Sequence, residues 1–351
     1  MIVPDEPEDP MDKILFVAQT ECDGLLGKAS LEALAAAKAL AGQLNAELAV
    51  GLVGDGVKAA ADAVAGCGAV AFYGVSGAEY ATARYATDAA ALAALCTAAG
   101  ANIVIGAATS RMSRVLPGVA ARLGGRSDTG VTALNVQDGK LMATRWYYRQ
   151  RMFAELTRQE RPWCLSLSSG CVAPYEGAAG SAEVTTVTPE LPAAGVRTEV
   201  TSMICPSAEE QTIRPDAALL FVAGAGWTKK QADGVPHLTE AEQIILDFLG
   251  KMQASLGTSK SLVDLSGEGQ QVMSFLTHMH QVGQTGSTPR HAKGLATCCH
   301  GEEPHTVGWR FIGERRAINL DANCGWAQGK ADVLYVADAF DVMRKVLEMM
   351  R

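Results

Sequence analysis

Short apolar runs alternate with alanine-rich helical segments through the first 125 residues, and this alternation limits the fold more than any other feature. Apolar runs at 14–18, 47–53, 69–73 and 102–106 predict strands, and the segments 28–40, 87–99 and 115–123 predict helices, the last beginning near Pro117. Strands that alternate with helices at this spacing form a parallel sheet that is covered by the helices. The sequence therefore predicts an α/β domain.

The alternation resumes in the last third of the chain after a different middle region. Residues 141–148 and 163–168 predict strands without long helices between them. Further strands are expected at 217–223, 262–264, 294–298, 316–320 and 333–336, with helices at 239–249 and 341–350. Thr239 is expected to cap the first of these helices, with Glu242 at capping-box spacing. The expected fold is α/β, with two doubly wound parallel-sheet domains, the second of them Rossmann-like.

Composition shifts place the domain boundaries. Residues 1–10 are acidic and proline-rich and are expected to form a disordered tail. They are not expected to be a signal peptide, since that needs a basic end and an apolar centre. An N-terminal domain is expected over 11–205, a linker over 206–216 and a C-terminal domain over 217–351. The linker lies in a stretch rich in Gly, Ala, Thr, Pro and Ser.

Charge and hydropathy exclude two classes of partner. The 351 residues carry a formal net charge of −8, which argues against nonspecific nucleic-acid binding because that needs a basic face. No apolar run approaches the roughly 18 residues of a membrane span. The chain has nine cysteines and no CxxC pair, so buried free thiols in a reducing, cytoplasmic compartment are expected.

The run Cys298-Cys299-His300 raises the question of a metal or thiol site. Adjacent cysteines do not easily share one tetrahedral zinc, and no second Cys/His pair lies at ligand spacing. His278 and His280 are the only nearby candidates for further ligands. A nucleophilic cysteine would need an orienting partner that the sequence does not identify. These readings remain alternatives to the cofactor site described next.

A glycine-flanked Gln-Thr pair at 281–286, with the sequence Gln-Val-Gly-Gln-Thr-Gly, indicates a tight turn whose backbone can approach a ligand closely. His305, Asn319 and Asp338 follow it, each near the end of a predicted strand. Because ligands of open α/β sheets bind beyond the carboxyl ends of the strands, these side chains are expected to converge on one ligand.

With its spacing, this set resembles the flavin-binding domain of the electron transfer flavoprotein alpha subunit. The hexapeptide 281–286 matches that family without change, Ala317-Ile318-Asn319 matches its Ala-Ile-Asn, and His305 falls where the family has its flavin-facing histidine. The run Ala337-Asp338-Ala339-Phe340 and the segment 115–123 also resemble the alpha-subunit pattern.

The resemblance implies an FAD held by the C-terminal domain, in a heterodimer with a beta subunit that would hold either AMP or a second FAD. The N-terminal domain would bind no cofactor and would pack on the beta subunit. The chain would act as an electron carrier without a substrate of its own. It would receive electrons from a flavin dehydrogenase and pass them to a quinone reductase or another redox protein.

By the same resemblance, Thr285 would lie near the flavin N5, His305 near the C2 carbonyl, and Asn319 and Asp338 beside the adenosine half. The full set of expected FAD-binding residues is Ser259, Lys260, Gln281, Val282, Gly283, Gln284, Thr285, Gly286, His300, Gly301, His305, Asn319, Asp338 and Ala339. No catalytic acid or base and no metal ligand are expected.

The chain also departs from the family. Lys260 stands where the family has arginine, which keeps the charge but loses the planar guanidinium. Gly226 replaces an arginine of the glycine-rich loop, and Trp227 replaces a short side chain. These departures motivate a rival hypothesis, a subunit that has lost its flavin and serves as a pairing scaffold. A third hypothesis is a thiol or metal enzyme that uses Cys298, Cys299 and His300.

Overall fold

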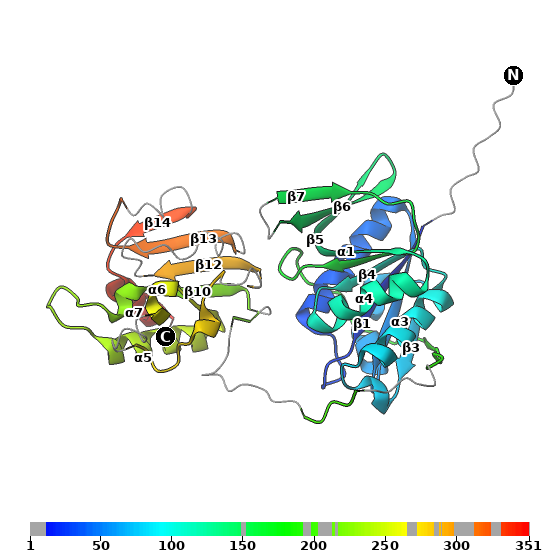
Figure 1. Ribbon diagram of the computed structural model, residues 1–351, viewed down its shortest axis with the longest axis horizontal. Coiled ribbons are helices and arrows are strands. Elements are labelled where there is room, and N and C mark those ends of the chain that lie inside the picture. Colours follow the sequence, from blue (N-terminus) through cyan, green and yellow to red (C-terminus); the bar gives the residue numbers. More distant parts are fainter. Residues whose placement is uncertain are drawn as a thin grey trace, which may run out of the picture. The chain divides into compact units, whose positions relative to one another are not determined.

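The computed structural model describes residues 12–148, 152–191, 198–202, 213–214, 217–264, 272–283, 288, 290–297, 312–323 and 331–350. The chain divides into two compact units, Met1–Met203 and Ile204–Arg351. Each unit contains one sheet with its own helices, so the expectation of two α/β domains is confirmed (Figure 1). The units are called unit 1 and unit 2 below.

Unit 1 is built on a nine-stranded mixed sheet with the order β7-β6-β5-β8-β4-β1-β2-β3-β9. Its strands are β1 (Lys13–Gln19), β2 (Glu47–Gly54), β3 (Ala71–Ser76), β4 (Ile103–Ala107), β5 (Arg126–Gln137), β6 (Lys140–Tyr147), β7 (Met152–Leu156), β8 (Trp163–Leu167) and β9 (Val184–Thr186). All pairings are parallel except β5 with β6 and β6 with β7.

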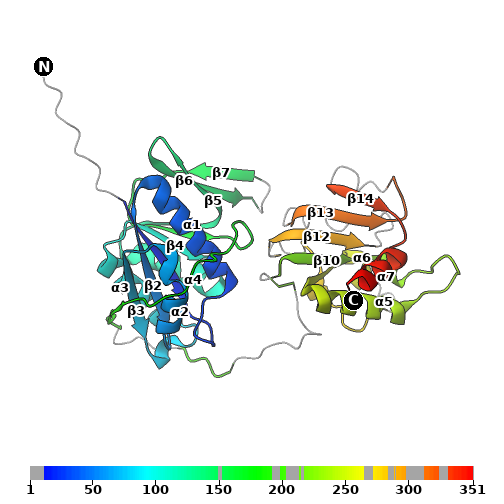
Figure 2. The same ribbon diagram turned by 180° about the vertical axis from the view of Figure 1, so that it is seen from behind.

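The central strand β1 is buried on both faces, which explains its continuous apolar sequence. Ile14 and Phe16 belong to the core beneath α1 (Lys28–Leu44) and α2 (Lys58–Ala63). Leu15 and Val17 belong to the core beneath α3 (Tyr85–Ala99) and α4 (Ser110–Arg122). Figure 1 shows α3 and α4 on one face of the sheet, and Figure 2 shows α1 and α2 on the other.

Several helix boundaries differ from expectation for identifiable reasons. Helix α1 continues past Gly42 to Leu44 and ends at Asn45, which takes the left-handed conformation with φ of 51°. The expected start of α4 at Pro117 was wrong. The helix begins at Ser110, because Thr109 Oγ1 accepts a hydrogen bond from Met112 N at 3.2 Å, and Pro117 lies inside it.

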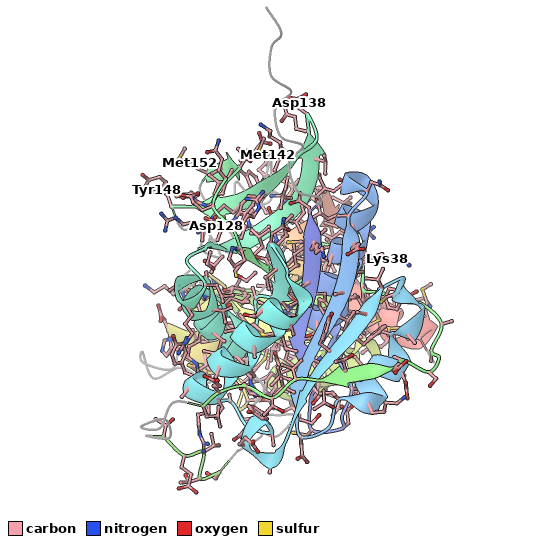
Figure 3. The ribbon with its side chains drawn as sticks, turned by 90° about the vertical axis from the view of Figure 1, so that its right-hand side faces the viewer. Lys38, Asp128, Asp138, Met142, Tyr148 and Met152 are labelled. Carbon is pink, nitrogen blue, oxygen red and sulfur yellow. The ribbon has the colours of Figure 1, made fainter. Side chains whose placement is uncertain are left out.

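Strands β5, β6 and β7 form an antiparallel extension of the sheet, which accounts for the change of sequence pattern in this region. Asp128 lies at its base and is 2% exposed. Its carboxylate accepts hydrogen bonds from Arg145 at 3.0 Å, from Trp163 Nε1 at 2.9 Å and from two nitrogens of Arg158. Figure 3 shows Asp128 below Tyr148 and Met152, which lie where β6 ends and β7 begins.

Unit 2 is built on a five-stranded parallel sheet with the order β11-β10-β12-β13-β14. Its strands are β10 (Leu219–Ala223), β11 (Ser255–Thr258), β12 (His291–Thr297), β13 (Ile312–Asn319) and β14 (Val333–Val336). Its α-helices are α5 (Leu238–Met252), α6 (Lys260–Asp264) and α7 (Ala339–Met349).

The helices described in unit 2 contribute to a core on one face of its sheet. Phe221 of β10, Ile245 of α5 and Phe340 of α7 belong to this core. The neighbouring residues Leu220 and Val222 point to the opposite face, where they form a smaller cluster. Figures 1 and 2 both show α5 and α7 on the same side of the strands.

Two expectations for unit 2 were wrong. Residues 262–264 belong to helix α6, and the strand in this region is β11, four residues that end at Thr258. A pattern of only three residues is too short to distinguish a strand from a helix. Helix α5 begins at Leu238, one residue before Thr239, and Glu242 accepts a hydrogen bond from Ser274 N at 2.8 Å instead of closing a capping box.

We expect Asp128→Asn to lower the free energy of unfolding by about 3–5 kcal/mol, because it leaves two partly buried arginines without their carboxylate. Burial alone would raise the pKa of Asp128, but the hydrogen bonds from Arg158, Trp163 and Arg145 and the charge of Arg158 hold it below the ordinary value of 3.8. A lowered carboxyl pKa stabilises the fold above 3.8, and this stability is lost as the pH falls through the folded pKa.

Urea unfolding of parent and variant between pH 7 and pH 3 measures both effects. The difference between the two proteins should shrink as the pH falls below about 4. Glu160→Gln is the control, because its ion pair with Arg126 is exposed and should contribute at most about 1 kcal/mol. Equal stability of Asp128→Asn and parent at pH 7 would contradict the expectation.

Candidate functional site

The carboxyl ends of the five strands of unit 2 meet at one edge, because all of these strands are parallel. Ser259 and Lys260 follow β11, Asn319 ends β13, and Asp338 and Ala339 follow β14. Cofactors of open parallel sheets bind at this edge. The structure therefore brings these five predicted residues to one edge of one sheet, which is called the carboxyl edge below.

Ser259 and Lys260 begin helix α6. Ser259 is 1% exposed, its N donates to Ala223 O at 2.9 Å, and its Oγ accepts from Leu262 N at 3.3 Å. This serine therefore joins the ends of β10 and β11 and caps the short helix. The Lys260 side chain is 55% exposed and lies 3.8 Å from Asp264 Oδ2, a solvent-screened ion pair that contributes at most about 1 kcal/mol.

Residues 281–283 lie beside the end of β11. Val282 N donates to Thr258 O at 3.1 Å, and Gln281 forms a parallel bridge with Thr258. Gly283 has φ of 82°, the left-handed conformation that favours glycine, and its N donates to Thr288 Oγ1 at 2.8 Å. The turn that the glycine pattern indicates therefore begins at the carboxyl edge.

Asn319 and Asp338 hold the ends of β13 and β14. Asn319 is 1% exposed, its Oδ1 accepts from Asp321 N at 2.9 Å, and its main-chain O accepts from Ala337 N at 3.1 Å. Asp338 is the N-cap of α7, and its Oδ1 accepts from Phe340 N at 2.8 Å and from Asp341 N at 3.3 Å. This cap uses one of the two carboxylate oxygens.

Helix α7 is also tied to α5 through an ion pair. Arg344 Nε donates to Glu240 Oε1 at 2.6 Å. The hydrogen bond from Arg344 lowers the pKa of Glu240, and the same bond raises the pKa of Arg344. Both side chains are partly exposed, so this pair orients α7 more than it stabilises unit 2.

The remaining predicted residues lie outside the described parts of the chain. They are Gln284, Thr285, Gly286, His300, Gly301 and His305, together with the alternative thiol residues Cys298 and Cys299. Thr297, the last described residue of β12, ends at the carboxyl edge directly before Cys298. Within the described ranges, no group of three or more His, Cys, Asp or Glu side chains is arranged to hold a metal ion.

Two buried residues at this edge escaped the sequence analysis. Trp227 is fully buried, and its Nε1 donates to Thr297 Oγ1 at 2.8 Å. The sequence marked Trp227 only as a departure from the family pattern, although a tryptophan directly after a strand and a glycine turn is a signal of local packing. Thr258 is also fully buried, and its hydroxyl has no hydrogen-bond partner among the described residues.

At the corresponding edge of unit 1, protein side chains occupy the space beside the end of β1. Arg111 donates to both carboxylate oxygens of Asp88, at 2.8 and 2.6 Å, and to Tyr80 O at 2.8 Å. A cavity of about 10 Å³ remains beside this pair, where the end of β1 places Gln19. That volume accommodates one water molecule.

The comparison with protein families gives one match, the electron transfer flavoprotein domain, over residues 14–192. The matched region is more than half of the 351 residues. The chain belongs to the electron transfer flavoprotein family. The match lies in unit 1, whereas the residues that carry the alpha-subunit resemblance lie mainly in unit 2.

A comparison with curated proteins finds no match. The family match supports a role in electron transport, with redox partners and a heterodimer-type interaction. Of the helices in the described ranges, none has the length and apolar character needed to cross a membrane.

We expect Asp338→Ala to lower the free energy of unfolding of unit 2 by about 1 kcal/mol, because the N-cap of α7 is lost. Asp338→Asn keeps an acceptor oxygen at the cap and should stay near the parent value. Thermal unfolding followed by circular dichroism measures the difference. Glu348→Ala, which removes an exposed ion pair at the other end of α7, should change stability by less than about 0.5 kcal/mol. Identical unfolding of Asp338→Ala and parent would show that the cap is unimportant.

Proposed function

We propose that the chain is an alpha-type electron transfer flavoprotein subunit whose unit 2 binds FAD at the carboxyl edge. The observation that carries this proposal is the position of Ser259, Lys260, Gln281, Asn319 and Asp338 at that edge of one parallel sheet. Membership of the family supplies the class of chemistry. The role is that of an electron carrier.

The described residues of the edge are compatible with such a ligand. Gly283 provides a turn in which the backbone carries no side chain, so a ligand can approach it closely. Thr258 offers a buried hydroxyl beside this turn, and Lys260 offers an exposed cation that is only loosely paired. These groups suit a ligand that combines hydrogen-bonding atoms with negative charge.

The roles of individual residues are those that the family resemblance implies for FAD, which supplies one- and two-electron transfer when it is bound. The ammonium group of Lys260 would stabilise negative charge on the flavin ring. Asn319 and Asp338, at the ends of β13 and β14, would contact the adenosine half. Thr285 and His305, implied by the resemblance, would donate hydrogen bonds to the flavin. No proton transfer by a side chain is required.

The antiparallel β5–β7 extension of unit 1 is a candidate surface for the beta subunit. Tyr148, Met152 and Phe153 are 73%, 55% and 56% exposed, and Figure 3 shows Tyr148 and Met152 close to one another. Phe153 stacks on Trp146 with ring centroids 3.8 Å apart. Exposed aromatic side chains gathered in one place are typical of protein interaction sites. The beta subunit would hold AMP or a second FAD.

The electron donor would be a flavin dehydrogenase, and the acceptor a quinone reductase or another redox protein. Both would reach the flavin by docking on unit 2, since transfer between two flavins needs close approach and no shared substrate.

A flavin-free pairing scaffold is the second candidate, and one observation favours it. Three described polar residues of the site already have structural partners: Ser259 caps α6, Asp338 caps α7, and Lys260 pairs with Asp264. These contacts would keep the edge folded without any cofactor.

The visible spectrum of the full chain, purified after co-expression with a beta-type subunit, separates the two candidates. We expect flavin absorption bands and release of FAD on denaturation, with about one FAD per unit 2. Extracting the flavin and adding FAD back should restore the bands. A complex without flavin bands even in excess FAD would exclude the electron carrier and favour the scaffold.

We expect Lys260→Ala to lower the reduction potential of the flavin, because a cation near the ring favours the reduced, more negative form. A shift of about 30 mV corresponds to about 1.4 kcal/mol for a two-electron couple, and exposure of the side chain makes a larger shift unexpected. Lys345→Ala is the matched control, an exposed lysine paired within α7 to Glu348 at 2.9 Å. Spectroelectrochemical titration of the FAD-loaded proteins gives both values. An unchanged potential in Lys260→Ala would exclude this role.

A further inference from the structure

Trp227 is buried beneath the carboxyl edge, beside the ends of β10 and β12. It lies in a single turn of 3₁₀ helix, η4 (Ala225–Thr228), that follows β10 directly. Its side chain is 0% exposed, one of the two tryptophans that are completely buried in the described chain. A tryptophan removed from water needs a hydrogen-bond acceptor for its indole N–H. The acceptor therefore shows which part of the structure Trp227 supports.

The acceptor is the last residue of β12. Trp227 Nε1 donates to Thr297 Oγ1 at 2.8 Å, and Thr297 Oγ1 in turn donates to Val222 O at 3.2 Å. Gly224 N donates to Thr297 O at 2.9 Å, so the backbone after β10 is bound to the same threonine. These three hydrogen bonds fix the ends of β10 and β12 to one another. Thr297 directly precedes Cys298-Cys299-His300 in the sequence.

The ring of Trp227 contacts a third segment of the edge. It packs against Phe340 with ring centroids 4.6 Å apart and an interplanar angle of 55°. Phe340 is 3% exposed, and its N donates to the capping carboxylate of Asp338 at 2.8 Å. Through this contact the indole holds the first turn of α7, and with it Asp338 and Ala339.

We propose that Trp227 is a positioning residue for the FAD site, because its hydrogen bond to Thr297 and its contact with Phe340 hold three segments of the carboxyl edge in one arrangement. This inference rests on the function proposed above. Trp227 is buried beneath the edge, and its effect on the cofactor passes through Thr297 and Phe340. Binding sites depend on such supporting residues, because a small displacement of the groups that contact the ligand strongly weakens its binding.

The test compares two identical substitutions in one chain. Trp227→Phe keeps an aromatic ring in the core but removes the N–H donor. Trp163→Phe in unit 1 does the same to the other fully buried tryptophan, whose Nε1 donates to Asp128 Oδ2 at 2.9 Å. Both variants lose one buried hydrogen bond, but only Trp227 adjoins the carboxyl edge. The readouts are the dissociation constant and the reduction potential of FAD in the full chain, with folding checked by circular dichroism.

We expect Trp227→Phe to weaken FAD binding by about three- to tenfold and to shift the flavin potential, in line with the loss of one buried hydrogen bond. Trp163→Phe should leave both quantities at the parent value. Parent-like affinity and potential in Trp227→Phe would overturn the inference while the proposed function stands. A parent protein that binds no FAD would instead overturn the proposed function.

A second pair of variants decides the matter if Trp227→Phe does not fold. Thr297→Val keeps the shape of the side chain but removes the acceptor hydroxyl, whereas Thr297→Ser keeps the hydroxyl and removes a methyl group. We expect weakened FAD binding in Thr297→Val and near-parent binding in Thr297→Ser. Equal affinity in these two variants would show that the indole hydrogen bond does not position the site.

Discussion

Parallel pairing of the central strands is the constraint on which both units depend. Each parallel connection must cross from one edge of the sheet to the other, so the segments that follow the strands gather at a single edge. In unit 2 this rule places residues that are distant in sequence, such as Ser259 and Asp338, at the same carboxyl edge. In unit 1 it places Gln19 near the ion pair of Asp88 and Arg111, and these side chains fill the space there. The same topology therefore places an ion pair beside the end of β1 in unit 1, and helix starts and a glycine turn at the carboxyl edge of unit 2.

The polar side chains of the unit 2 edge combine two roles. The N–H groups at the start of a helix need acceptors, and Ser259 and Asp338 supply them for α6 and α7. These caps hold the side chains in defined orientations before any ligand arrives. A ligand that binds there would meet groups whose rotamers are already set, which reduces the entropy lost on association. The structural contacts and the proposed binding role are in this sense compatible.

The sequence predicted the architecture well where its pattern was regular. The strands at β1, β2, β4 and β14 were expected within one or two residues, because each is a short apolar run bounded by polar or glycine residues. It failed at β11 and α6, where a strand of four residues is followed at once by a helix of five, too short for any period to be visible. It also failed at Pro117, because a proline inside a helix is tolerated when packing outweighs the lost hydrogen bond. The edge positions of Asn319 and Asp338 followed from the predicted strand ends. Ser259 was expected before a strand at 262–264, so its place after β11 needed the structure. The role of Trp227 needed the hydrogen bond to Thr297, which joins residues far apart in the sequence.

The buried carboxylate of Asp128 has a consequence for how unit 1 meets other proteins. Two arginines and one indole anchor the root of the β5–β7 extension, although its tip carries exposed aromatic groups. A hairpin on a loose root would sample many orientations, and a partner would have to freeze them on contact. In this chain the contacts of Asp128 fix the orientation of the extension when unit 1 folds. These contacts hold the strands that carry the exposed aromatic side chains, so a second protein that docked there would lose little conformational freedom on binding.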